Sequence, residues 1–224
     1  FLSITFRKIT TTSGGAVKRK FKGVTGKRSS QYRTVMKMER IRFTSIPTYT
    51  LNAGLGLLFM PILLVVLIIK RGTVVSVLQM FGESEYGPLI PMLLSAMMAT
   101  IVSMDCGSAP SMSLEGKSLW ILQSSPIDEK TIMMGKIDFH FFLNAVPAAV
   151  LSLLGSIILG MSILDVVLIT IYTVAFTYLI SSFGMMIGTM RANLNWTNPV
   201  IPIKQSMAVM ITLFGGWIVA ILYP

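Results

Sequence analysis

Long apolar stretches are the feature of this sequence that most limits its fold. Five of them occur after residue 50, separated by polar connectors, and they cover residues 51–69, 88–104, 139–159, 166–190 and 207–223. About 20 apolar residues in a helix cross the roughly 30 Å hydrocarbon core of a bilayer. Inside lipid, backbone groups must be paired within a helix or a closed barrel. Barrel strands alternate apolar and polar residues, whereas LLFMPILLVVLII (57–69) does not alternate. We therefore predict an all-α, polytopic transmembrane bundle of about five spans.

The composition agrees with this prediction and limits the possible chemistry. Hydrophobic residues make up 53% of the chain and charged residues 12%, against about 25% charged residues in soluble domains. A single cysteine, Cys106, excludes an internal disulfide and a cysteine-based zinc cluster. The stretch GVTGKRS (23–29) lacks the first glycine of a phosphate-binding loop and has Arg28 after Lys27. We therefore expect no metal and no cofactor.

Lysine and arginine are concentrated near the N-terminus. Residues 1–42 hold 12 of the 19 basic residues and a single acidic one, Glu39. If the N-terminus is cytosolic, 17 basic residues lie on the cytosolic side of the predicted spans and two lie on the other side. This distribution follows the positive-inside rule. It predicts a multi-pass protein of the cell membrane with a cytosolic N-terminus.

The chain then divides into two parts. Residues 1–46 are predicted to form a basic cytosolic arm, and residues 47–224 a transmembrane domain with cytosolic connectors at 105–138 and 191–206. Within the arm, residues 32–46 mix apolar and basic side chains in the manner of an interfacial amphipathic helix; the alternative is a solvated start of the first span. We expect the arm to bind anionic lipid rather than nucleic acid, because transmembrane spans follow it.

The chain begins with Phe1 and not with Met, and it shows no signal-peptide pattern. We therefore expect it to be a fragment of a longer protein.

No set of side chains in the sequence forms a recognisable catalytic group. His140, the sole histidine, follows Asp138 by two residues at the predicted cytosolic mouth of the third span. Such a pair serves as a proton relay in some membrane proteins, but we favour a pair that simply sits within reach of water. Asp105, after the second span, is likewise expected at the interface. Asp165 begins the fourth span, where an acid suits a helix N-terminus.

One face of the fourth span carries small and hydroxylated side chains at helical spacing. Its members are Thr170, Thr173, Thr177, Ser181, Gly184 and Gly188. Gly184 and Gly188 form a G-x-x-x-G pair, which allows helices to approach closely in lipid. The face is expected to form a translocation path, a subunit interface or ordinary packing within one bundle.

The connector between the second and third spans is expected to hold two helices. Ser125, Pro126 and Asp128 are typical of a helix start, and that helix is predicted to continue into the third span. Before it, SLEGKSLWIL (113–122) predicts a separate short helix with apolar residues around most of its circumference. Lipid headgroups or a protein partner must cover these residues, so Trp120 is a candidate docking residue.

Three stretches resemble the membrane permeases of ABC transporters, specifically the bacterial ABC-2 exporter-type group. They are KMERIRFTSIPTYTLN (37–52), SLEGKSLWILQSSPIDEKTIMMGK (113–136) and LNWTNPVIPIKQ (194–205). The resemblance implies a transport subunit without its own ATPase. It also implies two kinds of partner, a separate cytosolic ABC ATPase and a second permease copy or homologue.

The resemblance further implies where the ATPase docks. The expected coupling surface consists of Glu115, Gly116, Lys117, Trp120 and Pro126. A second cytosolic patch, without an assigned role, consists of Asn195, Trp196 and Asn198. On this hypothesis the chain is not an enzyme, because ATP hydrolysis takes place on the partner.

Two other functions remain open at this point. A membrane-embedded enzyme would need polar side chains that converge inside the bilayer, and the sequence shows only isolated ones. A non-catalytic membrane anchor would display the basic arm, with the spans serving only to hold it in place.

Overall fold

The computed structural model describes residues 30–83 and 86–222, and every regular element in these residues is helical. In chain order the elements are α2 (Gln31–Ser45), α3 (Pro47–Ile69), α4 (Arg71–Gly82), η1 (Gly87–Leu89), α5 (Ile90–Ser103), η2 (Ser113–Ser118), α6 (Leu119–Gln123), α7 (Glu129–Ile158), α8 (Ile163–Met190), α9 (Val200–Lys204) and α10 (Met207–Leu222). Four stretches are long and apolar enough to cross a membrane: α3, α7, α8 and Val200–Leu222. Together with the shorter α5 they form the predicted polytopic helical bundle.

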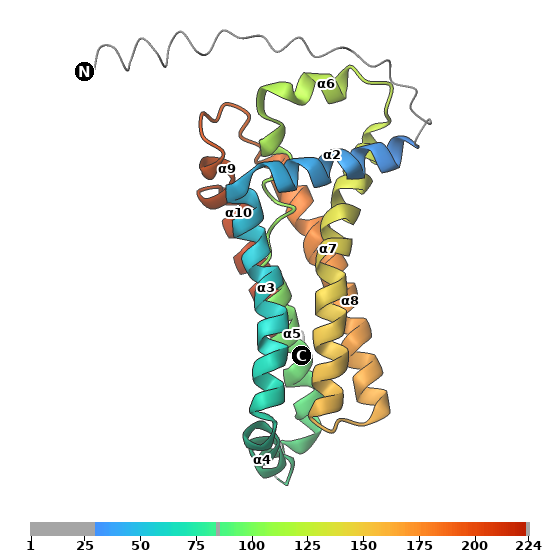
Figure 1. Cartoon of the computed structure of the whole chain (residues 1–224), viewed down its shortest axis with the longest axis vertical. Coiled ribbons are helices and arrows are strands. Elements are labelled where there is room, and N and C mark those ends of the chain that lie inside the picture. The colour runs from blue at the N-terminus through green and yellow to red at the C-terminus, as the bar shows by residue number, and fades with distance from the viewer. Residues whose placement is uncertain (1–29, 84–85, 223–224) are drawn as a thin grey trace, which may run out of the picture.

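The bundle has two different ends (Figure 1). α2 runs across one end, where α6 and α9 also lie, whereas α4 and the turn between α7 and α8 lie at the other end. We call these the α2 end and the α4 end. Between them, α8 packs against α7, α5 and α10, and α3 packs against α7. Most of the predicted basic arm, residues 1–29, lies outside the described residues.

A proline makes the corner between α2 and α3. Ile46 is extended, with φ −105° and ψ 100°, because a residue before proline avoids the helical conformation. Pro47 then opens α3 at a position where its missing N–H has no helical partner to lose. α3 therefore begins four residues before the start that the apolar stretch predicts. Because the chain turns at Ile46, α2 does not continue along the direction of α3 but runs across the end of the bundle.

The second predicted span is a short helix that ends at a break. α5 has 14 residues, about 21 Å of helix, which is shorter than the hydrocarbon core. The chain continues through residues 104–112 in turns, and Asp105–Ser111 are buried throughout. We call residues 104–112 the break segment. The expectation of an interfacial Asp105 is wrong, because this side chain is only 5% exposed.

The helix start predicted at Ser125 is displaced by three residues. The Ser125 hydroxyl donates to the Leu122 carbonyl at 2.7 Å and so closes the end of α6 instead of capping α7. Asp128 is the N-cap residue of α7. As predicted, one uninterrupted helix then continues from the connector through residues 139–158 of the third span.

A glycine divides the preceding stretch, which the sequence predicts as one short helix. Gly116 has a φ of +52°, which side-chain-bearing residues rarely adopt. A Cβ at this position would also lie 3.2 Å from the Trp196 ring. The chain therefore kinks at Gly116, inside η2, and α6 follows η2 directly from Leu119.

Candidate functional site

Charged side chains from three elements meet inside the α2 end of the bundle. Glu39 and Arg42 come from α2, Glu115 from η2 and Lys136 from α7. Glu39 and Lys136 are each 1% exposed and Glu115 is also buried. We call these four residues the ionic cluster. Glu39 and Lys136 are among the most deeply buried charged residues that the structure describes, whereas Arg42 is only partly buried. The four residues belong to segments that lie up to 97 residues apart.

The ionic cluster is a closed ring of alternating charge. Arg42 places Nη1 2.6 Å from Glu39 Oε2 and Nη2 2.6 Å from Glu115 Oε2. Lys136 Nζ completes the ring, at 2.8 Å from Glu39 Oε2 and 2.6 Å from Glu115 Oε1. Each carboxylate therefore contacts both cations, and the four charges sum to zero.

The electrostatic environment keeps Glu39 ionised. Burial alone would raise the pKa of its carboxyl, but Lys136, the interaction with His140 and the guanidinium of Arg42 together hold that pKa well below its usual range. Removing a charge from water costs several kcal/mol unless partners compensate for it. The ring therefore ties α2, η2 and α7 together only as long as all four members are present.

Hydroxyl groups extend the cluster toward the break segment. Ser111 Oγ donates to Glu39 Oε1 at 2.6 Å and accepts from Lys136 Nζ at 3.1 Å. Tyr49 OH donates to the Gly107 carbonyl at 2.7 Å and lies 2.9 Å from His140 Nε2. An apolar layer packs beside these groups; its buried members are Phe43, Tyr49, Ala53, Leu114, Phe139 and Ile203.

The structure divides the predicted ATPase-coupling residues into two groups. Lys117, Trp120 and Pro126 are exposed, and Trp120 is 64% exposed. Glu115 and Gly116 are buried, so they do not face a partner. Glu115 belongs instead to the ionic cluster, and Gly116 packs against an aromatic ring. The expected surface is thereby reduced to three residues.

The second predicted patch is joined to this connector through Trp196. Its Nε1 donates to the Ser113 carbonyl at 2.5 Å, and its ring packs on Gly116. Asn195 and Asn198 are exposed, and Asn198 Oδ1 accepts from the Val200 N–H at 3.0 Å at the start of α9. Trp196 thus fixes the 191–206 turn against η2, and the Asn198 side chain shapes the turn before α9.

The small-residue face of α8 lies inside the bundle. Five of its members are buried, and Thr170 is half-buried. The hydroxyls of Thr170, Thr173 and Thr177 each donate to the carbonyl four residues earlier, at 2.7–2.8 Å. Gly184 and Gly188 contact Ser108 and Ala109 of the break segment. Within the described residues this face therefore packs against the chain's own backbone.

The Asp138–His140 pair does not form, because the two side chains point to different partners. Asp138 Oδ2 accepts from Tyr32 OH at 2.7 Å. Partial burial and this hydrogen bond raise the pKa of Tyr32 to about 12, so the phenol remains a donor. His140 is 1% exposed and faces Tyr49 and Glu39. The expectation that this histidine sits within reach of water is therefore wrong.

Sequence reasoning missed the ionic cluster as a unit. It placed Glu115 on a docking surface and left Glu39, Arg42 and Lys136 without a role. One signal was available: Glu39 is the only acid among the 12 basic residues of positions 1–42. A lone acid in a basic helix that is predicted to face the membrane interface indicates a buried ion pair.

A comparison with known families adds the class of protein. Residues 52–224 match the model of a family described as membrane proteins of 12 TMs, meaning 12 transmembrane segments. The chain belongs to this family. The match covers most of the chain, including Glu115 and Lys136, whereas Glu39 and Arg42 precede it. No curated protein and no solved structure matches the chain.

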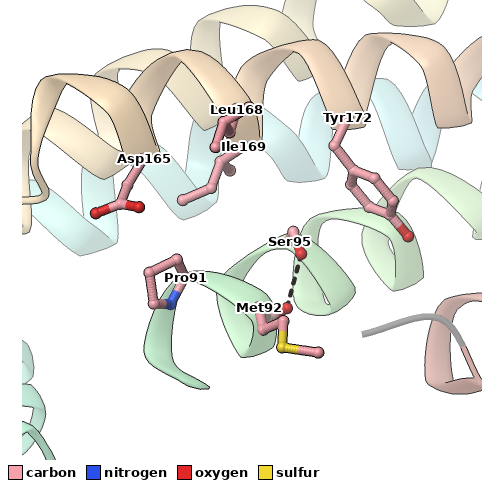
Figure 2. Close-up of a pocket in the computed structure, with 7 residues that line it drawn as sticks. All are labelled: Pro91, Met92, Ser95, Asp165, Leu168, Ile169 and Tyr172. Carbon is pink, nitrogen blue, oxygen red and sulfur yellow. Dashed lines mark hydrogen bonds between the residues drawn. The ribbon is translucent and has the colours of Figure 1, made fainter. Parts of the chain in front are cut away.

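This 12-TM family member also has a cavity of about 370 Å³ between α5 and α8, and no residue of the ionic cluster lines it (Figure 2). α5 and α8 line it with mainly apolar side chains, and Asp165 and Tyr172 lie along the same side of it. The Asp165 carboxylate accepts from the Ser162 hydroxyl at 2.7 Å, and Ser95 donates to the Met92 carbonyl at 2.7 Å. Ser162 is the N-cap residue of α8, and Asp165 lies in the first turn, where the sequence predicts an acid at the helix N-terminus. Within the described residues, the cavity brings no second charged residue to Asp165.

Proposed function

We propose that this protein is a membrane-spanning permease subunit of an ATP-driven, ABC-type exporter, and that a separate cytosolic ATPase docks at its α2 end. The observation that carries the proposal is α6. This short helix projects at the α2 end (Figure 1) and leaves Trp120 and Ile121 at least half exposed, while Leu122 packs inward. Exposed tryptophan on a fixed element is typical of residues that dominate a protein–protein interface.

The ionic cluster would transmit force from the docked partner. α6 follows η2 directly, and η2 is held to α2 and α7 through Glu115. Displacing α6 would therefore move the crossing helix α2 and the long helix α7 together, because separating buried charges is costly. In this proposal the chain itself hydrolyses nothing. A second permease copy or homologue would complete the transport pathway.

The α2 end is the cytosolic side in this proposal. Arg33, Lys37 and Arg40 are exposed along α2, and at spacings of four and three residues they share one face of the helix. Such a face beside the membrane attracts anionic lipid headgroups, at about 1 kcal/mol per basic residue.

Cysteine labelling tests this orientation. Cys106 is buried, so the native chain should react slowly with a membrane-impermeant maleimide. We expect Ser118→Cys, at the exposed α2 end, to be labelled in inside-out vesicles and not in intact cells. Leu164→Cys, at the exposed α4 end, should show the opposite behaviour. Labelling of Ser118→Cys from outside intact cells would refute the orientation.

Co-purification tests the ATPase partner. The probe is an ABC ATPase encoded beside this chain, co-expressed with a tagged permease and measured by vanadate-sensitive ATP hydrolysis in the purified fraction. We expect Trp120→Ala to reduce the retained activity at least about tenfold, because a hot-spot residue contributes 2 kcal/mol or more. Leu164→Ala removes an equally exposed apolar side chain at the α4 end and should retain the partner.

Two results would contradict the proposal. Equal retention by both variants would remove α6 as the docking element. Absence of any retained ATPase, combined with binding of the chain to anionic vesicles through α2, would favour the membrane-anchor function instead.

A further inference from the structure

The break segment places polar side chains deep inside the bundle. Asp105 packs against Gly56 of α3, where an added Cβ would lie 3.2 Å from the Asp105 Cβ. Gly56 is nine residues beyond Pro47, the first residue of α3, which corresponds to about 14 Å along the helix. An ionisable residue at such a depth is costly and usually has a function.

Three buried polar atoms around this point have no hydrogen-bond partner among residues 30–83 and 86–222. They are Asp105 Oδ2, His140 Nδ1 and Asn144 Oδ1. His140 and Asn144 are one turn apart on α7 and share a face, and the Asp105 carboxyl interacts with both side chains. A Cβ on Gly107 would lie 3.0 Å from His140 Nδ1 and 3.1 Å from Asp105 Oδ1. The imidazole and the carboxyl group therefore flank the same glycine.

All three atoms act as acceptors in this arrangement. Tyr49 donates its hydroxyl hydrogen to Gly107 O, so its oxygen is left to accept from His140 Nε2. A neutral imidazole with its hydrogen on Nε2 carries none on Nδ1. A carboxylate and an amide oxygen also only accept. The Asn144 amide N–H interacts with the Asp105 carboxyl, but in the described part of the chain none of the three acceptor atoms has a donor of its own, an arrangement that costs about 1–3 kcal/mol for each unsatisfied atom.

We propose that Asp105, His140 and Asn144 form a binding site for one proton at the helix break. The proton comes from hydronium in the aqueous phase: one O–H bond of hydronium breaks, a water molecule is left, and a new bond forms to Asp105 Oδ2 or to His140 Nδ1. On Asp105 it provides an O–H donor for Asn144 Oδ1. On His140 it provides an N–H donor for the Asp105 carboxylate. In each case one proton satisfies two of the three acceptors and leaves the third, His140 Nδ1 or Asn144 Oδ1, without a donor, whatever the protein transports.

The other ionisable groups around the site balance one another. From α2, η2 and α7 come the two carboxylates and two cations of the ionic cluster, which sum to zero. Tyr49 of α3 and Cys106 of the break segment are of types that are uncharged near neutral pH. α5 and α10 contain no charged residue, and Asp165 of α8 lies in its first turn, toward the α4 end. Asp105 thus remains as the uncompensated charge.

The single histidine of the chain allows a direct test on the unmodified protein. The full chain, purified in detergent with a non-histidine tag and carrying ¹⁵N-labelled histidine, is titrated from about pH 8 to about pH 5, the range in which imidazoles change charge. We expect the His140 Nδ1 resonance to change, or the infrared band of a protonated carboxyl group to appear, with one proton taken up in total. No change in either signal across this range would overturn the proposal.

A matched pair of variants identifies the carboxyl group. Asp105→Asn should abolish the infrared carboxyl band or shift the pH at which the His140 resonance changes. Asp165→Asn, which alters a carboxylate in the first turn of α8 near the α4 end, should leave both signals as in the unmodified protein. If the variants behave alike, Asp105 is not part of the proton site. If Asp105→Asn fails to fold, the titration of the unmodified protein still decides.

Discussion

Lys136→Met should destabilise the folded protein by about 3–5 kcal/mol, the usual cost of removing one partner of a buried ion pair. Methionine preserves most of the side-chain volume, so the loss is mainly electrostatic. Without the ammonium group, Glu39 and Glu115 share Arg42 as their single ring cation. Urea unfolding of the purified protein in detergent, followed by tryptophan fluorescence, measures the difference in the free energy of unfolding.

Two further variants separate charge pairing from general damage to α7. Lys130→Met removes an exposed lysine from the first turns of the same helix and should change stability by less than about 0.5 kcal/mol. Adding Glu115→Gln to Lys136→Met restores one cation to one carboxylate, so the double variant should regain a large part of the loss. If Lys136→Met and Lys130→Met have the same free energy of unfolding, the ionic cluster does not hold α2, η2 and α7 together.

The sequence predicted the parts of the fold that depend on long-range hydropathy. α3, α7 and α8 follow from apolar runs of more than 18 residues, because lipid leaves no other way to pair the backbone. Boundaries were less accurate where local chemistry decides them. Pro47 starts α3 before the first residue of the apolar run. The Ser125 hydroxyl bonds to the end of α6 instead of capping the start of α7.

The second span was predicted at nearly the right residues, since the apolar helix covers Gly87–Ser103, but apolar composition does not reveal the buried helix break that follows it. The residues after Ser103 are small or polar, which suits an interfacial loop equally well. Only the packing shows that the break segment is buried against α8. The ionic cluster was missed for a related reason: its members lie far apart in sequence, and nothing in the spacing of Glu39, Glu115 and Lys136 indicates that they meet.

Gly188→Ala is expected to destabilise the bundle by about 1–3 kcal/mol or more, the cost of forcing extra volume into a packed interior. Its Cβ would collide with the carbonyl oxygen of Ala109 and lie 3.0 Å from the carbonyl carbon. Both groups are backbone, so neither can rotate away. α8 and the break segment would have to separate. Thermal unfolding in detergent, measured by size-exclusion chromatography of heated samples, detects the change.

Alanine substitutions at two other glycines serve as references for the loss of stability expected of Gly188→Ala. Gly184→Ala meets the Ser108 hydroxyl, which can rotate, so its loss should be smaller than that of Gly188→Ala. Gly54→Ala, on α3, meets no atom within 4 Å and should gain up to about 1 kcal/mol from the higher helix propensity of alanine. All three changes add one methyl group to a helix. The ranking of the three variants by thermal stability therefore isolates the effect of the contact with the break segment. A Gly188→Ala protein as stable as Gly54→Ala would mean that α8 does not pack against Ala109 of the break segment.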